Sequence, residues 1–251
     1  MAGPMATIPE SPSRPALGER EFVAMMALLQ ALQALSIDAM LPALGLMASE
    51  LGASDPNHRQ LVVGVFLLGA GLGALIPGPL SDRFGRRPVV MACLMSFIAT
   101  SLACALVSDF ETLVALRFIQ GLGCSALAVL PPAIIRDRLE GDQMARLQSL
   151  IGVVFMVVPM LAPALGQAVL MVASWRWIFI VIALFGLAAL IWAWRRMPET
   201  LHPEFRQQIS PRAIAGNMGE VLFNRAAFGY VIGSMVMMSA MWGFINSSQQ
   251  L

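Results

Sequence analysis

Apolar runs of about 20 residues recur along this chain and limit what it can fold into. Short connections that hold most of the charged residues separate the runs. A helix of that length crosses roughly 30 Å of hydrocarbon, whereas a membrane strand needs only about 10 residues. The chain is 58% apolar and 12% charged, which is about half the charge of a soluble domain. The sequence therefore predicts an all-α membrane protein.

The runs predict a helical bundle over residues 21–196 and one further membrane helix over residues 226–251. Residues 1–20 are rich in proline and serine, and we expect them to form a disordered cytoplasmic tail. Five arginines lie from Arg195 to Arg225, and we expect residues 197–225 to form a central cytoplasmic loop. The predicted spans are residues 22–44, 60–80, 89–107, 112–135, 147–172, 178–194 and 226–244.

Arginine accounts for every basic residue in the chain, and its distribution is uneven. Arg59 and Arg176 fall on one side of the predicted membrane and Arg117 lies within a span, whereas all the others fall on the opposite side. Because cytoplasmic loops carry the excess of arginine, we expect a multi-pass protein with a cytoplasmic N-terminus. Trp175 and Trp177 are expected to sit at the outer interface.

Residues that commonly carry catalysis or bind metals are few and scattered. Cys93, Cys104 and Cys124 fall inside apolar runs, and His58 and His202 are isolated in connections. This spacing predicts neither a metal site nor a disulfide framework. We therefore expect no cofactor, no nucleic-acid partner and no enzyme activity.

A charged stretch, residues 78–88, joins the second and third predicted spans, and we expect a tight hairpin connection. It resembles the signature loop between helices two and three of the major facilitator superfamily, Gly-x-Leu-Ala/Ser-Asp-Arg/Lys-x-Gly-Arg/Lys-Arg/Lys. An ordinary positively charged loop is the alternative, but here the acid, the glycines and the bases all fall at the right offsets. The resemblance implies a cytoplasmic gate. The matching positions are Gly78, Leu80, Ser81, Asp82, Arg83, Gly85, Arg86 and Arg87.

The fourth span opens with Arg117, Gln120 and Gly121, which share one helix face at spacings of three and four. Together with Gly123 they resemble the superfamily's fourth-helix motif, Arg-x-x-Gln-Gly-x-Gly. The resemblance implies that Arg117 takes part in proton coupling. The alternative is an arginine that extends to the outer interface.

Asp38 is the residue of the first span that most disfavours membrane insertion, because inserting a carboxylate at mid-membrane costs roughly 2.5–3.5 kcal/mol. Without a fixed partner, burial favours its protonated form, so that it can exchange protons. Residues 35–44 are similar to the first helix of the bicyclomycin/chloramphenicol-resistance branch, where an acid precedes a proline. The alternative is that Asp38 lies near the far surface, since Pro42 ends the helix nearby.

The fifth span resembles the antiporter motif, Gly-x-x-x-Gly-Pro-x-x-Gly-Gly, at Pro163 and Gly166. Other residues replace three of its glycines, and Pro159 adds a second proline. The two prolines are expected to kink the helix and to create a mobile wall that faces the substrate. In the second span, Gly69 and Gly73 are expected to allow close helix packing.

The resemblance covers the N-terminal six-helix bundle, the central loop and a seventh helix of the superfamily, with the C-terminal bundle missing. It implies proton-coupled export of amphipathic, drug-like molecules across a bacterial inner membrane, with the lipid bilayer, the proton and a missing C-terminal half as partners. An uptake carrier for a sugar or metabolite and an inactive half-transporter are the alternatives. The expected cavity residues are Gln30, Gln33, Gln120, Pro159 and Pro163.

Overall fold

The computed structural model describes residues 18–53, 56–201 and 223–248, with Glu204, Gly216 and Gly219 as isolated positions. The chain forms two compact units, residues 1–207 and 208–251. Residues 1–17 of the predicted tail and most of the predicted loop 197–225 lie outside the described residues.

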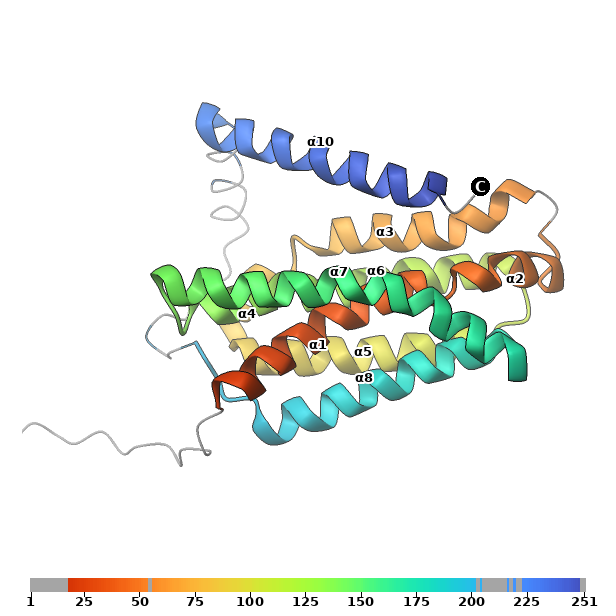
Figure 1. Cartoon of the computed structure of the whole chain (residues 1–251), viewed down its shortest axis with the longest axis horizontal. Helices are drawn as coiled ribbons and strands as arrows, with labels where there is room; N and C mark the ends of the chain where they lie inside the picture. The colour runs from red at the N-terminus through yellow and green to blue at the C-terminus, as the bar shows by residue number, and fades with distance from the viewer. Residues whose placement is uncertain are drawn as a thin grey trace, which may run out of the picture. The chain divides into compact units, whose positions relative to one another are not determined.

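The described part of the first unit is built from helices that run side by side along its length (Figure 1). Helix α6 lies centrally and packs against α1, α3 and α5, while α8 packs on α5 and α7 packs on α1. In chain order the elements are α1 (Glu19–Asp38), η1 (Leu41–Ala43), α2 (Leu44–Glu50), η2 (Pro56–Gln60), α3 (Leu61–Gly73), α4 (Pro77–Phe84), α5 (Arg86–Ala105), α6 (Phe110–Arg136), α7 (Gly141–Val172) and α8 (Arg176–Arg196).

Five helical segments among the described residues are long and apolar enough to cross a membrane. A sixth is added if His58–Gly73 and Pro77–Phe84, which meet at a bend of 45°, form one broken span. These six coincide with the six spans predicted for residues 21–196. The prediction of an all-α membrane bundle is therefore confirmed.

The connection between the second and third spans differs from the predicted hairpin. Residues 78–84 are helical as part of α4, and only Gly85 separates α4 from α5. Pro77 and Pro79 lie in the first turn of α4, where the fixed φ of proline suits a helix and its missing N–H costs nothing. The prolines therefore start a short helix here, and Gly85, with φ of +100°, makes the turn.

Helices α3 and α6 approach each other at glycines. A Cβ atom at Gly69 would overlap the carbonyl oxygen of Phe118, and one at Gly121 would overlap that of Phe66. At Gly73 an added Cβ would lie 2.7 Å from the carbonyl oxygen of Leu122. The predicted packing role of Gly69 and Gly73 is confirmed, and Gly121 supplies the matching surface on α6.

Helix α7 buries the smallest share of its apolar stretch among the five long segments. Met156 and Met160 are strongly exposed, as are several neighbours toward both ends of the helix. The helix bends in its C-terminal half (Figure 1), which is also the half that contains Pro159 and Pro163. Because proline removes a backbone hydrogen bond and crowds the preceding turn, these two residues account for the bend.

The second unit contains helix α10 (Arg225–Ser248). This helix coincides with the predicted seventh span. Its described apolar stretch, Ala227–Met237, is shorter than the spans of the first unit.

Candidate functional site

Arg117 lies at the centre of the first unit with its side chain fully buried. Its Nη1 donates to Oε1 of Gln120 at 2.6 Å, and its Nη2 donates to the carbonyl oxygen of Ser36 at 3.1 Å. Its Nε donates to the carbonyl oxygen of Val62 at 3.2 Å, and its guanidinium carbon lies 4.2 Å from the ring centroid of Phe66. The guanidinium is thus held inside the bundle by neutral groups, rather than reaching an interface.

Gln120 continues this set of contacts across the bundle. Its Nε2 donates to Oγ of Ser101 at 2.7 Å, and that hydroxyl donates to the carbonyl oxygen of Phe97. Ser36, Arg117, Gln120 and Ser101 therefore form one buried polar chain that joins α1, α6 and α5. The sequence did not single out Ser36 or Ser101. The signal that could have found them is that each is a small polar residue inside an apolar span.

Asp38 is the last residue of α1 and is only 2% exposed. Its Oδ2 has no hydrogen-bond partner in the part of the chain that the structure describes. A buried polar oxygen without a hydrogen-bond partner costs free energy, so Asp38 is an unusual residue at this position. Ser36, which accepts from Arg117, lies two residues earlier on the same helix.

Gly166 brings α7 against the end of α1. A Cβ at this position would overlap the carbonyl oxygen of Ala39 and approach the ring of Pro42. The glycine that matches the antiporter motif therefore allows backbone contact directly after Asp38. Any larger residue would push α7 away from this point.

A cavity of about 370 Å³ lies between α1, α6 and α7. Gln30 and Gln33 line it, together with Gln148. The other residues that line the cavity are apolar, so the cavity offers a few hydrogen-bonding groups in an apolar surrounding. Gln120, Pro159 and Pro163 are not among its lining residues. The apolar lining consists of Ala128, Pro132, Ile135, Ile151, Gly152 and Phe155.

At one end of the bundle, Arg86 connects several elements. Its Nη1 donates to Oδ1 of Asp82 at 2.6 Å, and its Nε donates to Oδ2 of Asp137 at 2.9 Å. Asp137 follows directly after α6, and its Oδ2 also accepts from the hydroxyl of Thr200 at 3.3 Å. Ser81 gives Arg86 a further acceptor. The arginine thus ties α4, α5 and the end of α6 together.

Glu199 caps α5 at the same end. Its carboxylate accepts from the backbone N–H of Arg86 at 2.8 Å and from that of Arg87 at 3.3 Å. A Cβ at Gly85 would overlap this carboxylate, so the glycine also leaves room for the cap. The sequence marked the segment of Glu199 only as the start of a loop, and it gave Asp137 no role.

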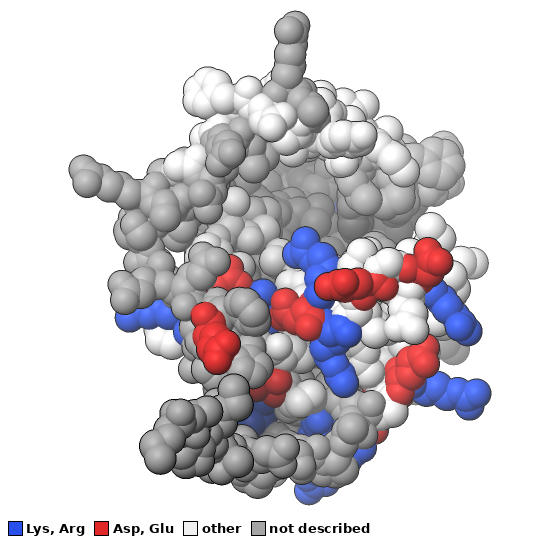
Figure 2. Space-filling view, turned by 90° about the vertical axis from the view of Figure 1, so that its left-hand side faces the viewer, with Lys and Arg blue, Asp and Glu red and all other residues white. Residues whose placement is uncertain are grey.

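The remaining predicted gate residues take simpler positions. Arg87 donates from Nη2 to the carbonyl oxygen of Trp194 at 2.8 Å. The guanidinium of Arg83 lies 5.1 Å from the ring centroid of Phe84, and the carbonyl oxygen of Gly78 accepts from Ser81. Acidic and basic side chains gather in alternation at this end of the molecule (Figure 2). We call it the Arg86 end.

The opposite end is held by a second set of contacts. Glu50, at the end of α2, accepts from Nε1 of Trp175 at 2.7 Å and from Nη1 of Arg176 at 3.2 Å. Arg176 also donates to the carbonyl oxygen of Val107 at 3.1 Å. Trp175 is 1% exposed, and its hydrogen bond to Glu50 satisfies the indole N–H inside the protein. Trp177 is 52% exposed.

The sequence profile of the Major Facilitator Superfamily matches residues 26–250. The chain belongs to this superfamily. The family is one of transporters rather than enzymes, in agreement with the sequence.

Several bacterial proteins are similar to the chain. It is 38% identical to the uncharacterised MFS-type transporter YdgK of Bacillus subtilis (strain 168) over 83% of this chain and 52% of that protein. A bicyclomycin resistance protein homologue of Haemophilus influenzae is 30% identical over 90% of this chain and 56% of that protein. A chloramphenicol resistance protein of Pseudomonas aeruginosa is 37% identical over 67% of this chain and 40% of that protein. The chain thus spans about half the length of these relatives.

The fold agrees with solved structures of the superfamily. A proton:xylose symporter has a TM-score of 0.66 at 16% identity, over 84% of this chain and 51% of the symporter. At that identity the likeness concerns the fold alone. The bundle described above is therefore a major facilitator bundle.

Proposed function

We propose that this chain supplies the N-terminal half of a proton-coupled exporter of drug-like molecules in a bacterial inner membrane. Support comes from its similarity to proteins named for resistance to bicyclomycin and chloramphenicol. The cavity agrees with that substrate class, because a few amides in an apolar space suit amphipathic molecules with few polar groups. An uptake carrier for a sugar would need more hydrogen-bonding side chains in its cavity.

The observation that carries proton coupling is Asp38, a buried carboxyl group with one oxygen that has no hydrogen-bond partner among the described residues. In the proposed cycle, protonation of Asp38 from outside releases the substrate, and deprotonation toward the cytoplasm restores the binding form. The two protonation states differ in their affinity for the substrate, which is what couples one movement to the other. Arg117 is the fixed positive charge of this cycle, and Ser36 and Gln120 hold its orientation.

The Arg86 end is proposed to face the cytoplasm, since it carries most of the arginines of the described helices. There Arg86, Asp82, Asp137 and Glu199 would form the cytoplasmic latch. In alternating access two bundles rock about a central site. The exposed apolar face of α7 is proposed to meet the second half that the relatives contain.

The experiment tests competition between a drug and a proton on the chain itself. The purified chain is titrated with chloramphenicol in weakly buffered detergent solution, while binding and the change of pH are recorded. Binding should release up to one proton per drug, whereas Asp38→Asn, which resembles the protonated form, should bind the drug more weakly and release no proton. Gln33→Ala, which changes the cavity but leaves the acid in place, should weaken binding and keep the proton release per bound drug.

Equal proton release from the chain and from Asp38→Asn would remove Asp38 from the mechanism. Drug export is tested separately in bacteria that lack their own exporters. There the chain, joined to a C-terminal half from a relative, should lower the cellular content of chloramphenicol. No change in that content would refute export.

A further inference from the structure

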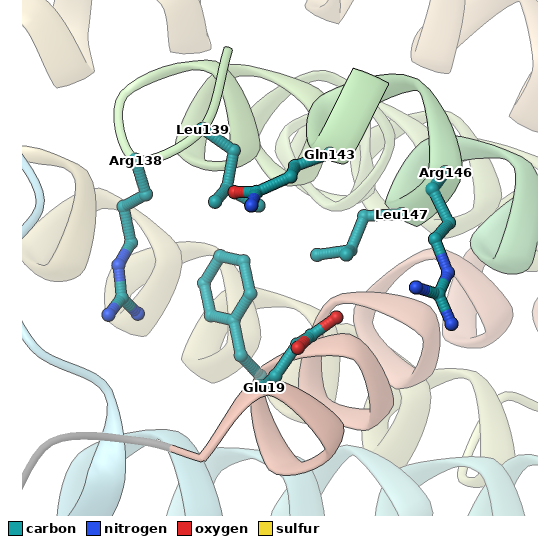
Figure 3. A pocket seen from close by; sticks show the side chains of 7 residues that line it. Glu19, Arg138, Leu139, Gln143, Arg146 and Leu147 are labelled. Carbon is teal, nitrogen blue, oxygen red and sulfur yellow. The ribbon is translucent and has the colours of Figure 1, made fainter. Parts of the chain in front are cut away.

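A second cavity of about 320 Å³ lies at the Arg86 end, between the start of α1, the connection after α6 and the start of α7. Figure 3 shows side chains from these three elements around it, with Arg138 and Arg146 on opposite sides and Glu19 between them. The charged and polar members are Glu19, Arg138, Gln143 and Arg146, and the apolar members are Phe22, Leu139 and Leu147. The predicted gate and the polar chain around Arg117 use none of these residues.

The two arginines of this cavity are not engaged by acids. Among the residues that the structure describes, neither Arg138 nor Arg146 forms an ion pair, and Glu19 forms none either. The ion pairs of the described residues are made by Arg86, Arg176 and Arg196 instead. Two guanidinium groups that flank one cavity, neither of them in an ion pair, have donors to offer to an incoming acid.

Arg138 is oriented before any ligand arrives. Its guanidinium carbon lies 4.7 Å from the ring centroid of Phe22, and the same ring forms part of the cavity wall. Such a cation–π contact restricts the long arginine side chain, so less freedom is lost when it binds. Phe22 is itself 4% exposed and belongs to the core, which gives the arginine a rigid support.

The apolar side chains decide what kind of molecule would carry the acid. Phe22 and Leu147 are buried and form a floor beneath the charged rim. A free inorganic ion would make no contact with these apolar side chains. A molecule with an acidic head and an apolar body would use both surfaces, and the volume is at the lower end of ligand cavities, which run from about 300 Å³.

We propose that this cavity binds the phosphate or carboxylate head of an amphipathic molecule between Arg138 and Arg146. Gln143 offers an amide donor to the same head, and Glu19 opposes it. The source is either an anionic lipid or a soluble amphiphile, since both present the same chemistry. The site does not depend on transport, so a chain that exports nothing would still have it.

The test uses the full chain in nanodiscs of phosphatidylcholine, with dodecyl phosphate as the probe and empty nanodiscs as the baseline. Saturable binding is measured by equilibrium dialysis. Arg138→Gln and Arg146→Gln should each weaken binding about tenfold, because each removes a charge-assisted contact. Glu19→Gln should tighten binding severalfold, because it removes the opposing charge.

The matched control is Arg195→Gln, which removes an exposed arginine at the same end of the bundle but outside the cavity. It should leave the affinity unchanged. All four substitutions change exposed side chains, so the fold should tolerate them. Opposite effects of Glu19 and the two cavity arginines would separate a binding site from a general loss of positive charge or of structure.

A second arm identifies the source of the head group. If phosphatidylglycerol in the nanodisc displaces the probe, the site is assigned to a lipid. If phosphatidylglycerol does not displace the probe, the site is assigned to a soluble amphiphile. The proposal is overturned if the probe binds no better than to empty nanodiscs. It is also overturned if Arg195→Gln weakens binding as much as the cavity variants do.

Discussion

Gly121→Ala should force α3 and α6 apart and lower the thermal stability of the bundle. A methyl group there would overlap the carbonyl oxygen of Phe66 and would lie 2.9 Å from the backbone nitrogen of Ala70. Both neighbours are backbone atoms, so no side-chain rotation can relieve the contact. The helices must separate, which also loosens the contacts at Gly69 and Gly73.

Overpacking of this kind costs about 1–3 kcal/mol. In a chain of this size 1 kcal/mol corresponds to about 2–4 °C in Tm, so we expect Tm to fall by roughly 2–12 °C. The assay heats the purified chain in detergent with a thiol-reactive fluorophore. Cys104 and Cys124 are buried, so they react only when the helices separate.

The matched control is Gly64→Ala on α3. Nothing lies within 4 Å of a Cβ atom added there, and alanine favours a helix by about 1 kcal/mol over glycine. Tm should therefore stay the same or rise by a few degrees. Equal shifts for the two variants would refute the reasoning, because the loss would then come from glycine replacement in general rather than from the contact between α3 and α6.

Two further predictions concern hydrogen bonds. The backbone N–H of Thr112 donates to Asp109 at 2.8 Å and, as the first cause, holds the pKa of that carboxyl below its usual range. A carboxyl group whose pKa is lowered by folding stabilises the fold above a pH of about 4, and this stabilisation is lost as the pH falls through the folded pKa. The Tm difference between the chain and Asp109→Asn should therefore shrink between pH 5 and 3. A Tm difference that does not depend on pH would contradict this. Ser101→Ala leaves Nε2 of Gln120 without its buried acceptor and should cost about 1–3 kcal/mol, visible as a lower Tm, whereas an unchanged Tm would show that the polar chain contributes nothing.

The membrane spans could be predicted well, because length and apolar composition alone decide whether a helix can cross a bilayer. The close contact of α3 with α6 was also within reach, since Gly69 and Gly73 lie one turn apart on one face. The gate motif predicted which residues gather at the Arg86 end, but not the helix α4 within it. Proline within such a charged connection usually indicates a turn, whereas in the first turn of α4 it starts a helix.

Partners that are distant in the sequence were not predictable. Glu199 caps a helix that begins more than a hundred residues earlier, and no local pattern announces that contact. Ser36 and Ser101 are ordinary small residues until Arg117 and Gln120 reach them from α6. The hydrogen bond from Trp175 to Glu50 likewise joins residues 125 positions apart, and no local pattern predicts it.

The bundle is fastened at both ends by contacts within itself. At one end Arg196 of α8 holds Glu21 of α1 at 2.7 Å, and at the other end Glu50 meets Trp175 and Arg176. Helices α1 and α8 therefore cannot splay at either rim without breaking charged or indole hydrogen bonds. A bundle held in this way would move as one rigid body, and any hinge would lie outside its six spans.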